Sequence, residues 1–141
     1  MSVPNIVIDT NVVVAALRSK RGASFKLISL IGTKKFKIHD SVALVLEYED
    51  VIQRHRVELG FSQDEVSELI DSLCALAKHN RIYFLWRPSL PDANDEMILE
   101  LAVSAHCEYI VTHNIADFTG IEKFGVKAIT PGAFLRIINE V

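Results

Sequence analysis

Residues 6–12 read IVIDTNV and decide how the chain begins. The first three are consecutive β-branched residues, and a short apolar run of this kind is typical of a strand buried within a sheet. The run stops at Asp9, and the apolar residues that follow over 11–17 predict a helix. We therefore expect a buried strand that leads directly into a helix, with an aspartate at the junction.

Similar short runs recur along the chain and alternate with helical patterns. Ser62 and Glu65 form the capping-box pattern that opens a helix, and Pro131 is well placed to begin the last one. Further strands are predicted at 36–38, 82–86, 109–112 and 126–129, and further helices at 24–31, 42–55, 62–77, 95–105 and from 131 onward. This alternation favours an α/β fold of three layers with a central, mostly parallel sheet, in a single domain over residues 1–141.

The composition is that of a globular protein. Half of the 141 residues are hydrophobic, which is enough apolar material for a core. The net charge of −3 argues against a dedicated DNA-binding module, since such modules usually carry a strong basic excess. No apolar run is long enough to span a bilayer and no signal peptide is recognisable, so we expect a cytoplasmic protein without membrane contact. Cys74 and Cys107 form no CxxC pair, which leaves a zinc or redox site without support.

Several candidate functional residues follow strands or begin helices. In open parallel sheets the ligand site lies beyond the carboxyl ends of the strands. Asp9 directly follows the first strand, and Thr112 ends the clearest late strand. The remaining candidates lie on segments that can reach the same edge: Glu47, Asp95, Asn114 and Asp117. We therefore expect a group of acidic side chains at one edge of the sheet.

A group of carboxylates needs a cation. Carboxylates without cationic partners repel one another, and a hard divalent ion relieves that repulsion. Mg²⁺ prefers oxygen ligands and keeps waters that a phosphate can displace. Such an ion lowers the pKa of bound water and stabilises in-line displacement at phosphorus. These residue types therefore indicate metal-assisted hydrolysis of a phosphodiester.

Each of these residues also has a purely structural interpretation. On spacing alone, Asp9 could equally well cap the helix that follows it. Asn11 could be a turn residue, or it could orient Asp9. Competing acids lie beside two of the candidates: Glu49 and Asp50 beside Glu47, and Asp92 and Glu96 beside Asp95, which itself could be a first-turn acid favoured by the helix dipole.

Taken together, four segments in this order resemble the PIN-domain family. The first is IVIDTNV at 6–12, an apolar strand that runs into Asp-Thr-Asn. The second is SVALVLEYEDV at 41–51, a serine before a helix that carries a glutamate. The third is the acidic turn and helix that begin at 92, and the fourth is YIVTHN at 109–114 followed by Asp117-Phe118. The resemblance covers nearly the whole chain and is closest to the virulence-associated-protein-C-like toxins of toxin–antitoxin pairs.

The resemblance implies a three-layer α/β/α PIN-like domain and a ribonuclease that uses Mg²⁺ or Mn²⁺. Asp9, Glu47 and Asp95 match the family's metal-binding acids, and Asn11 and Thr112 would support them. The family's fourth motif often has an aspartate where this chain has Asn114, and Asp117 could supply the missing carboxylate. The resemblance also implies an RNA substrate, a homodimer and a small antitoxin partner of a type II toxin–antitoxin pair.

Two other functions stay open at this point. Asn114 and the mild acidity are also compatible with a catalytically weakened PIN fold that binds RNA or regulates a partner. A phosphohydrolase of the haloacid-dehalogenase type also begins with a strand ending in Asp. That class normally has a second aspartate two residues later, and this chain has Asn11 there.

Overall fold

The computed structural model describes residues 3–82 and 89–140. The described residues form the strands β1 (Asn5–Ile8), β2 (Lys37–Asp40), β3 (Lys78–His79), β4 (Tyr109–Val111) and β5 (Lys127–Ile129). Their helices are α1 (Thr10–Arg18), α2 (Ala23–Ser29), α3 (Val42–Leu59), α4 (Gln63–Leu76), α5 (Ala93–Ser104) and α6 (Pro131–Ile137), with 3₁₀ turns η1 (Ile115–Phe118) and η2 (Ile121–Phe124).

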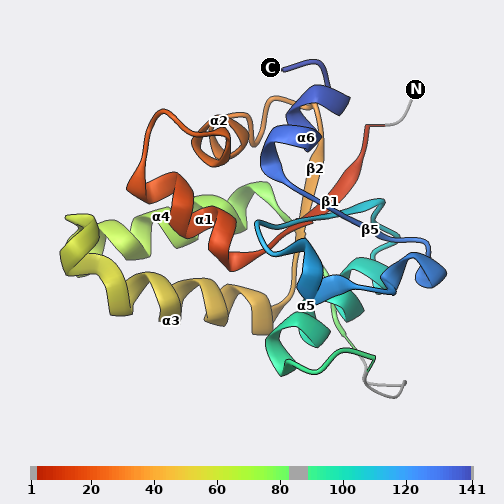
Figure 1. Ribbon diagram of the computed structural model, residues 1–141. Coiled ribbons are helices and arrows are strands. Elements are labelled where there is room, and N and C mark those ends of the chain that lie inside the picture. The colour runs from red at the N-terminus through yellow and green to blue at the C-terminus, as the bar shows by residue number, and fades with distance from the viewer. Residues whose placement is uncertain (1–2, 83–88, 141) are drawn as a thin grey trace.

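The strands form one sheet in the order β3-β2-β1-β4-β5, and every described pair is parallel. In Figure 1, α6 overlaps the upper part of the strands, whereas α5, which packs against β1, β2 and β4, lies toward their lower end. This confirms the predicted three-layer α/β/α fold with a parallel sheet. Within the described ranges, no helix is both long and apolar enough to cross a membrane.

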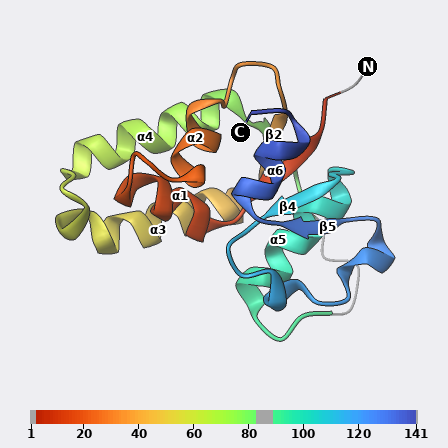
Figure 2. The ribbon, with the colours of Figure 1, turned by 45° about the horizontal axis from the view of Figure 1, so that its top comes forward.

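The core surrounds the central strand β1, as its β-branched sequence predicts. Ile6 and Val7 have no exposed surface. The Phe134 ring of α6 packs edge-on against Phe36 and Tyr109, with ring centroids 5.5 and 5.8 Å apart. Figure 2 shows α6 lying across the strands near the C-terminus. Burial on both faces explains why β1 and β4 are apolar without alternation.

The register of the sheet places Asp9 beside Thr112. Ile8 pairs with Val111, and the Asp9 backbone N–H donates to the Val111 carbonyl at 2.9 Å. The buried Tyr48 hydroxyl of α3 donates to the Ile8 carbonyl. The helix that carries Glu47 is therefore tied to the end of the strand that precedes Asp9.

The sequence misplaced some elements. The strand expected at 82–86 lies mostly outside the described residues, and Ile82 itself is not in a strand. The actual edge strand, Lys78–His79, is short and exposed, so it carries no apolar signal. The helix expected at 42–55 continues to Leu59, because Gly60 adopts the left-handed conformation that ends it there (φ 82°). The capping box at Ser62 and Glu65 is confirmed.

Candidate active-site cleft

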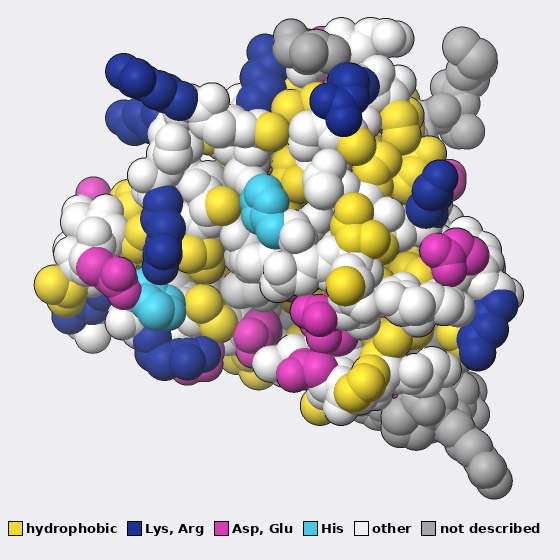
Figure 3. Space-filling model, viewed as in Figure 1, with side chains coloured by type: hydrophobic (Ala, Val, Ile, Leu, Met, Phe, Trp, Pro, Cys, Tyr) yellow, Lys and Arg dark blue, Asp and Glu magenta, His cyan; other side chains and the backbone are white. Residues whose placement is uncertain are grey.

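A cleft of about 500 Å³ opens where the carboxyl ends of β1 and β4 meet α1, α3 and α5. Acidic side chains gather near the middle of the face shown in Figure 3. The cleft is lined by Asp9, Thr10, Asn11, Val14, Ala15, Arg18, Glu47, Val51, His55, Asp92, Asn94, Asp95, Asn114 and Asp117. Six of the seven site residues proposed from sequence are in this lining. The seventh, Thr112, lies outside the lining and donates a hydrogen bond to Asp9.

Asp9 is held by side chains from two segments. It is 8% exposed, and its Oδ2 accepts hydrogen bonds from Thr112 Oγ1 at 2.8 Å and Asn11 Nδ2 at 3.3 Å. It occupies the N-cap position of α1, but its side chain makes no capping hydrogen bond, so the capping interpretation was wrong in that respect. Burial raises the pKa of Asp9, and the Thr112 hydroxyl and the nearby Thr10 and Asn11 amides partly offset this.

Thr112 connects this network to the loop after β4. Its side chain is fully buried, and its Oγ1 accepts hydrogen bonds from the Asn114 backbone N–H at 3.0 Å and Asn11 Nδ2 at 3.4 Å. Asn11 Oδ1 in turn accepts from the His113 backbone N–H at 3.2 Å. Asn11 therefore lies inside α1 and braces Asp9, and it is not a turn residue.

Glu47 is the glutamate of α3 that faces the cleft. Its competitors Glu49 and Asp50 are exposed and outside the cleft lining, and Asp50 pairs with Arg54 at 2.9 Å. Burial and then the charge of Asp50 raise the pKa of Glu47, with smaller contributions from acids across the cleft.

Three neighbouring acids at the start of α5 make different contacts. Asp92 caps the helix, because its Oδ1 accepts from the Asn94 and Asp95 backbone N–H groups at 2.8 and 3.2 Å. Glu96 is buried and accepts from the backbone N–H groups of Ser89 and Leu90, so it anchors the preceding loop. Asp95 lines the cleft together with Asp92, and it is not the residue that caps the helix. Its pKa is raised to about 6 by burial, then by Asp92, Asp9 and Asp117.

Both residues proposed for the fourth position line the cleft. Asp117, at η1, raises the pKa of Asp9 and of Asp95, so its charge acts on both. Asn114 brings an amide to the same rim. Position 114 therefore supplies no carboxylate to the cleft, whereas Asp117, three residues later, does.

The profile of the family described as PIN domain matches residues 5–116, which contain Asp9, Glu47 and Asp95. The chain belongs to the PIN-domain family. No curated protein sequence matches it.

Solved structures share the fold of this PIN domain. A structure of VapBC2 from Rickettsia felis, bound to a DNA fragment from their promoter, aligns with a TM-score of 0.62 at 15% identity, covering 89% of this chain and 98% of the other. A structure of VapBC-1 from nontypeable Haemophilus influenzae aligns with a TM-score of 0.59 at 14% identity, covering 91% and 98%. At these identities the likeness concerns the fold alone.

The oxygen atoms available as metal ligands in the PIN-domain cleft suit a hard divalent cation. They are carboxylate and amide oxygens, and the buried Thr10 hydroxyl beside them has no hydrogen-bond partner within the described part of the chain. No three His, Cys, Asp or Glu side chains among residues 3–82 and 89–140 already stand close enough together to hold an ion. The cleft therefore offers oxygen ligands from separate elements without a preassembled set of three acidic ligands.

Arg18 and His55 also line the cleft, although they are not among the site residues predicted from the sequence, where they belong to small basic clusters typical of a solvated surface. The available signal was helical spacing, because His55 lies eight residues after Glu47 on the same face of α3.

Replacing Asp95 by Asn is expected to stabilise the metal-free protein above about pH 6. The raised pKa means that the folded state holds the Asp95 proton more tightly than the unfolded state does, so stability is lost as pH rises from about 4 toward about 6. Thermal unfolding in EDTA between pH 4 and 8 measures this. The gap between variant and wild type should shrink below about pH 5, and Asp71→Asn, an exposed acid of α4, should show no such pattern. Equal unfolding temperatures for Asp95→Asn and wild type at every pH would contradict the assignment.

Proposed function

We propose that this PIN domain is a metal-dependent endoribonuclease and the toxin of a toxin–antitoxin pair. The observation that carries the proposal is the convergence of Asp9, Glu47, Asp95 and Asp117 on one cleft. Three of these carboxylates have raised pKa values, which is the electrostatic state that a divalent cation relieves. PIN domains are typically nucleases.

In this proposal Asp9, Glu47 and Asp95 hold Mg²⁺ or Mn²⁺, and Asp117 or Asn114 completes the site. When bound, the ion supplies Lewis acidity toward a phosphodiester and lowers the pKa of water. Thr112 and Asn11 keep the Asp9 carboxylate in one orientation. Carboxylates around the cleft accept the proton that the attacking water gives up.

The proposed partners follow from the solved relatives and the family. The structural neighbours are VapBC toxin–antitoxin complexes, which supports a small antitoxin as a partner. We also propose RNA as the substrate and a homodimer as the assembly.

A catalytically weakened, RNA-binding PIN domain is the second candidate, and Asn114 at the rim of the cleft is the observation that favours it. The family match leaves the haloacid-dehalogenase alternative without support, and Asn11 is engaged with Asp9 as a brace.

A mixed single-stranded RNA pool, and DNA of the same sequences, should be incubated with the protein in EDTA, Mg²⁺ or Mn²⁺. RNA cleavage that requires a metal is expected, since the carboxylates alone supply no Lewis acid for the phosphodiester. Asp9→Asn protein purified in the same way controls for a contaminating nuclease. Metal-independent RNA binding without cleavage in either metal would overturn the enzyme in favour of the second candidate.

A further inference from the structure

The cleft does not end at the carboxylates. It continues between α1 and α3 over the half-buried apolar side chains of Val14, Ala15 and Val51. Its far end is lined by Arg18 and His55. One continuous cleft therefore has an anionic end, an apolar middle and a basic end.

Helix geometry separates the two ends. Glu47, Val51 and His55 follow one another at four-residue spacing and so share one face of α3. Eight residues of helix rise about 12 Å, which places the basic end well beyond the groups that could surround one ion at the carboxylates. The basic end is therefore a separate feature of the cleft.

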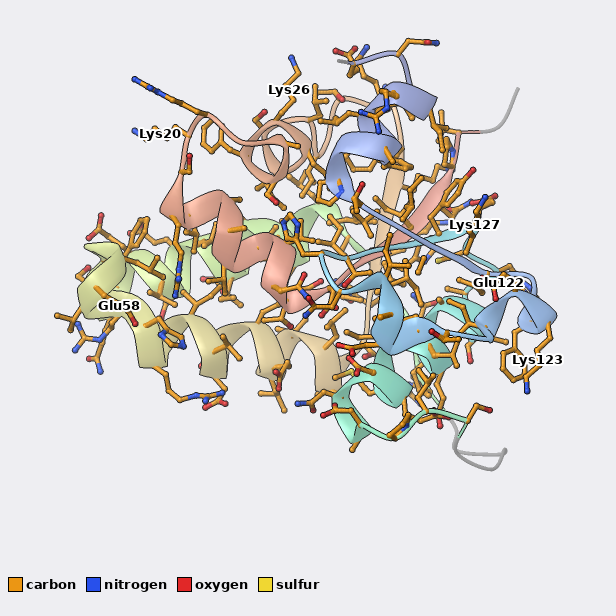
Figure 4. All side chains as sticks on the ribbon, in the orientation of Figure 1. Lys20, Lys26, Glu58, Glu122, Lys123 and Lys127 are labelled. Atoms are coloured by element: carbon orange, nitrogen blue, oxygen red, sulfur yellow. The ribbon has the colours of Figure 1, made fainter. Side chains whose placement is uncertain are left out.

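A carboxylate outside the cleft lining already pairs with both basic side chains. Glu58 Oε1 accepts a hydrogen bond from His55 Nδ1 at 2.5 Å, and Glu58 Oε2 lies 4.0 Å from Arg18 Nη2. The His55 hydrogen bond lowers the pKa of Glu58, with a further contribution from Arg18. Figure 4 labels Glu58 at the end of α3 remote from the strands. Arg18 and His55 thus already bind one anionic group in the free protein.

We propose that Arg18 and His55 form a second phosphate-binding subsite, which holds a backbone phosphate remote from the bond that is cut, and that Glu58 occupies this subsite until RNA displaces it. This inference rests on the proposed ribonuclease function. An arginine and an imidazole N–H are both suitable phosphate donors. The apolar middle of the cleft suits the sugar or base of the nucleotide between the two ends.

Breaking the contacts of Glu58 with Arg18 and His55 costs little free energy. The Arg18 and Glu58 side chains are 53% and 62% exposed, and exposed ion pairs contribute little to stability. A backbone phosphate presents two non-bridging oxygens, as the carboxylate it replaces does, and these match the planar guanidinium. The subsite also offsets the repulsion that the acidic end alone would exert on an RNA strand.

The test is binding of a fluorescein-labelled single-stranded RNA, measured by anisotropy in EDTA at several salt concentrations. Arg18→Ala should weaken binding about fivefold and reduce the slope of log K against log salt by about 0.7, the value for one lost phosphate contact on a single strand. Arg54→Ala is the matched control, because Arg54 is also exposed and ion-paired, near the same end of α3, but is outside the cleft lining. It should leave the slope unchanged.

The second pair of variants tests the role of Glu58. Glu58→Gln should tighten RNA binding, because it removes the competing anion from Arg18 and His55. Asp50→Asn removes the acid that pairs with Arg54 instead, and it should leave affinity at the wild-type value.

The outcomes separate this inference from the proposed function. Equal losses in slope for Arg18→Ala and Arg54→Ala, or no tightening by Glu58→Gln, would overturn the subsite while leaving metal-dependent cleavage intact. A wild-type protein that neither binds nor cleaves RNA would overturn both.

Discussion

Replacing Asp9 by Asn is expected to lower the rate of RNA cleavage by roughly 10²–10³-fold or more, the scale on which loss of one preorganised electrostatic group acts. Asparagine keeps the shape of the side chain and an oxygen that can accept from Thr112 and Asn11. It removes the charge that the proposed site needs. Cleavage in Mn²⁺, measured as an initial rate on a defined RNA, checks this.

The same substitution is expected to leave the metal-free protein folded and at least as stable as wild type. Burial raises the pKa of Asp9, which means that the charged carboxylate is an unfavourable group in the folded protein above its pKa. Unfolding in EDTA at neutral pH measures this effect. Asp40→Asn is the matched control and should keep the wild-type cleavage rate, since Asp40 is also a buried acid, at the end of β2, but it pairs with His79 and lies outside the cleft. Full activity in folded Asp9→Asn protein would remove Asp9 from the site.

Glu47→Gln is expected to lower the cleavage rate about 10²-fold, whereas Glu49→Gln should not change it. The two glutamates are two residues apart on α3, so they point to different faces of the same helix. Glu47 lines the cleft, and Glu49 is exposed outside it. The two variants share the same change in charge and helix propensity.

Both variants should be compared at several Mn²⁺ concentrations, because a lost ligand raises the concentration needed for half-maximal rate. Such a rise is expected for Glu47→Gln alone. Similar losses in the two variants would mean that helix stability or general electrostatics, and not a ligand role for Glu47, explains the effect.

Much of the fold was readable from local sequence. The β-branched run before Asp9 predicted the central strand, because a strand buried on both faces has no alternation. The capping box at Ser62 and Glu65 predicted the start of α4, since both of its hydrogen bonds form within four residues. The order of four motifs predicted the family, which the match over 5–116 confirms.

Some elements could not be predicted from the local sequence, because tertiary contacts or backbone conformation determine them. The edge strand β3 consists of Lys78 and His79, which are exposed and owe their conformation to pairing with β2. The end of α3 depends on the left-handed conformation of Gly60, which a pattern of apolar residues does not report. The choice among Asp92, Asp95 and Glu96 required knowing that Asp92 caps α5 and that Glu96 binds the preceding loop.

The sequence by itself determined most of the elements, their alternation and the residue types that could bind a cation, because these depend on short-range propensity and periodicity. Only the tertiary structure decided which of those residues meet. The parallel register brings Asp9 beside Thr112, and the packing of α3 against α1 brings Glu47 to Asp9 and Arg18 to His55 and Glu58. Burial and mutual charge then shift the pKa values of the acids. The contributions of Asp9 and Asp117 to the pKa of Asp95 come from residues distant along the chain, and therefore no local pattern contains them.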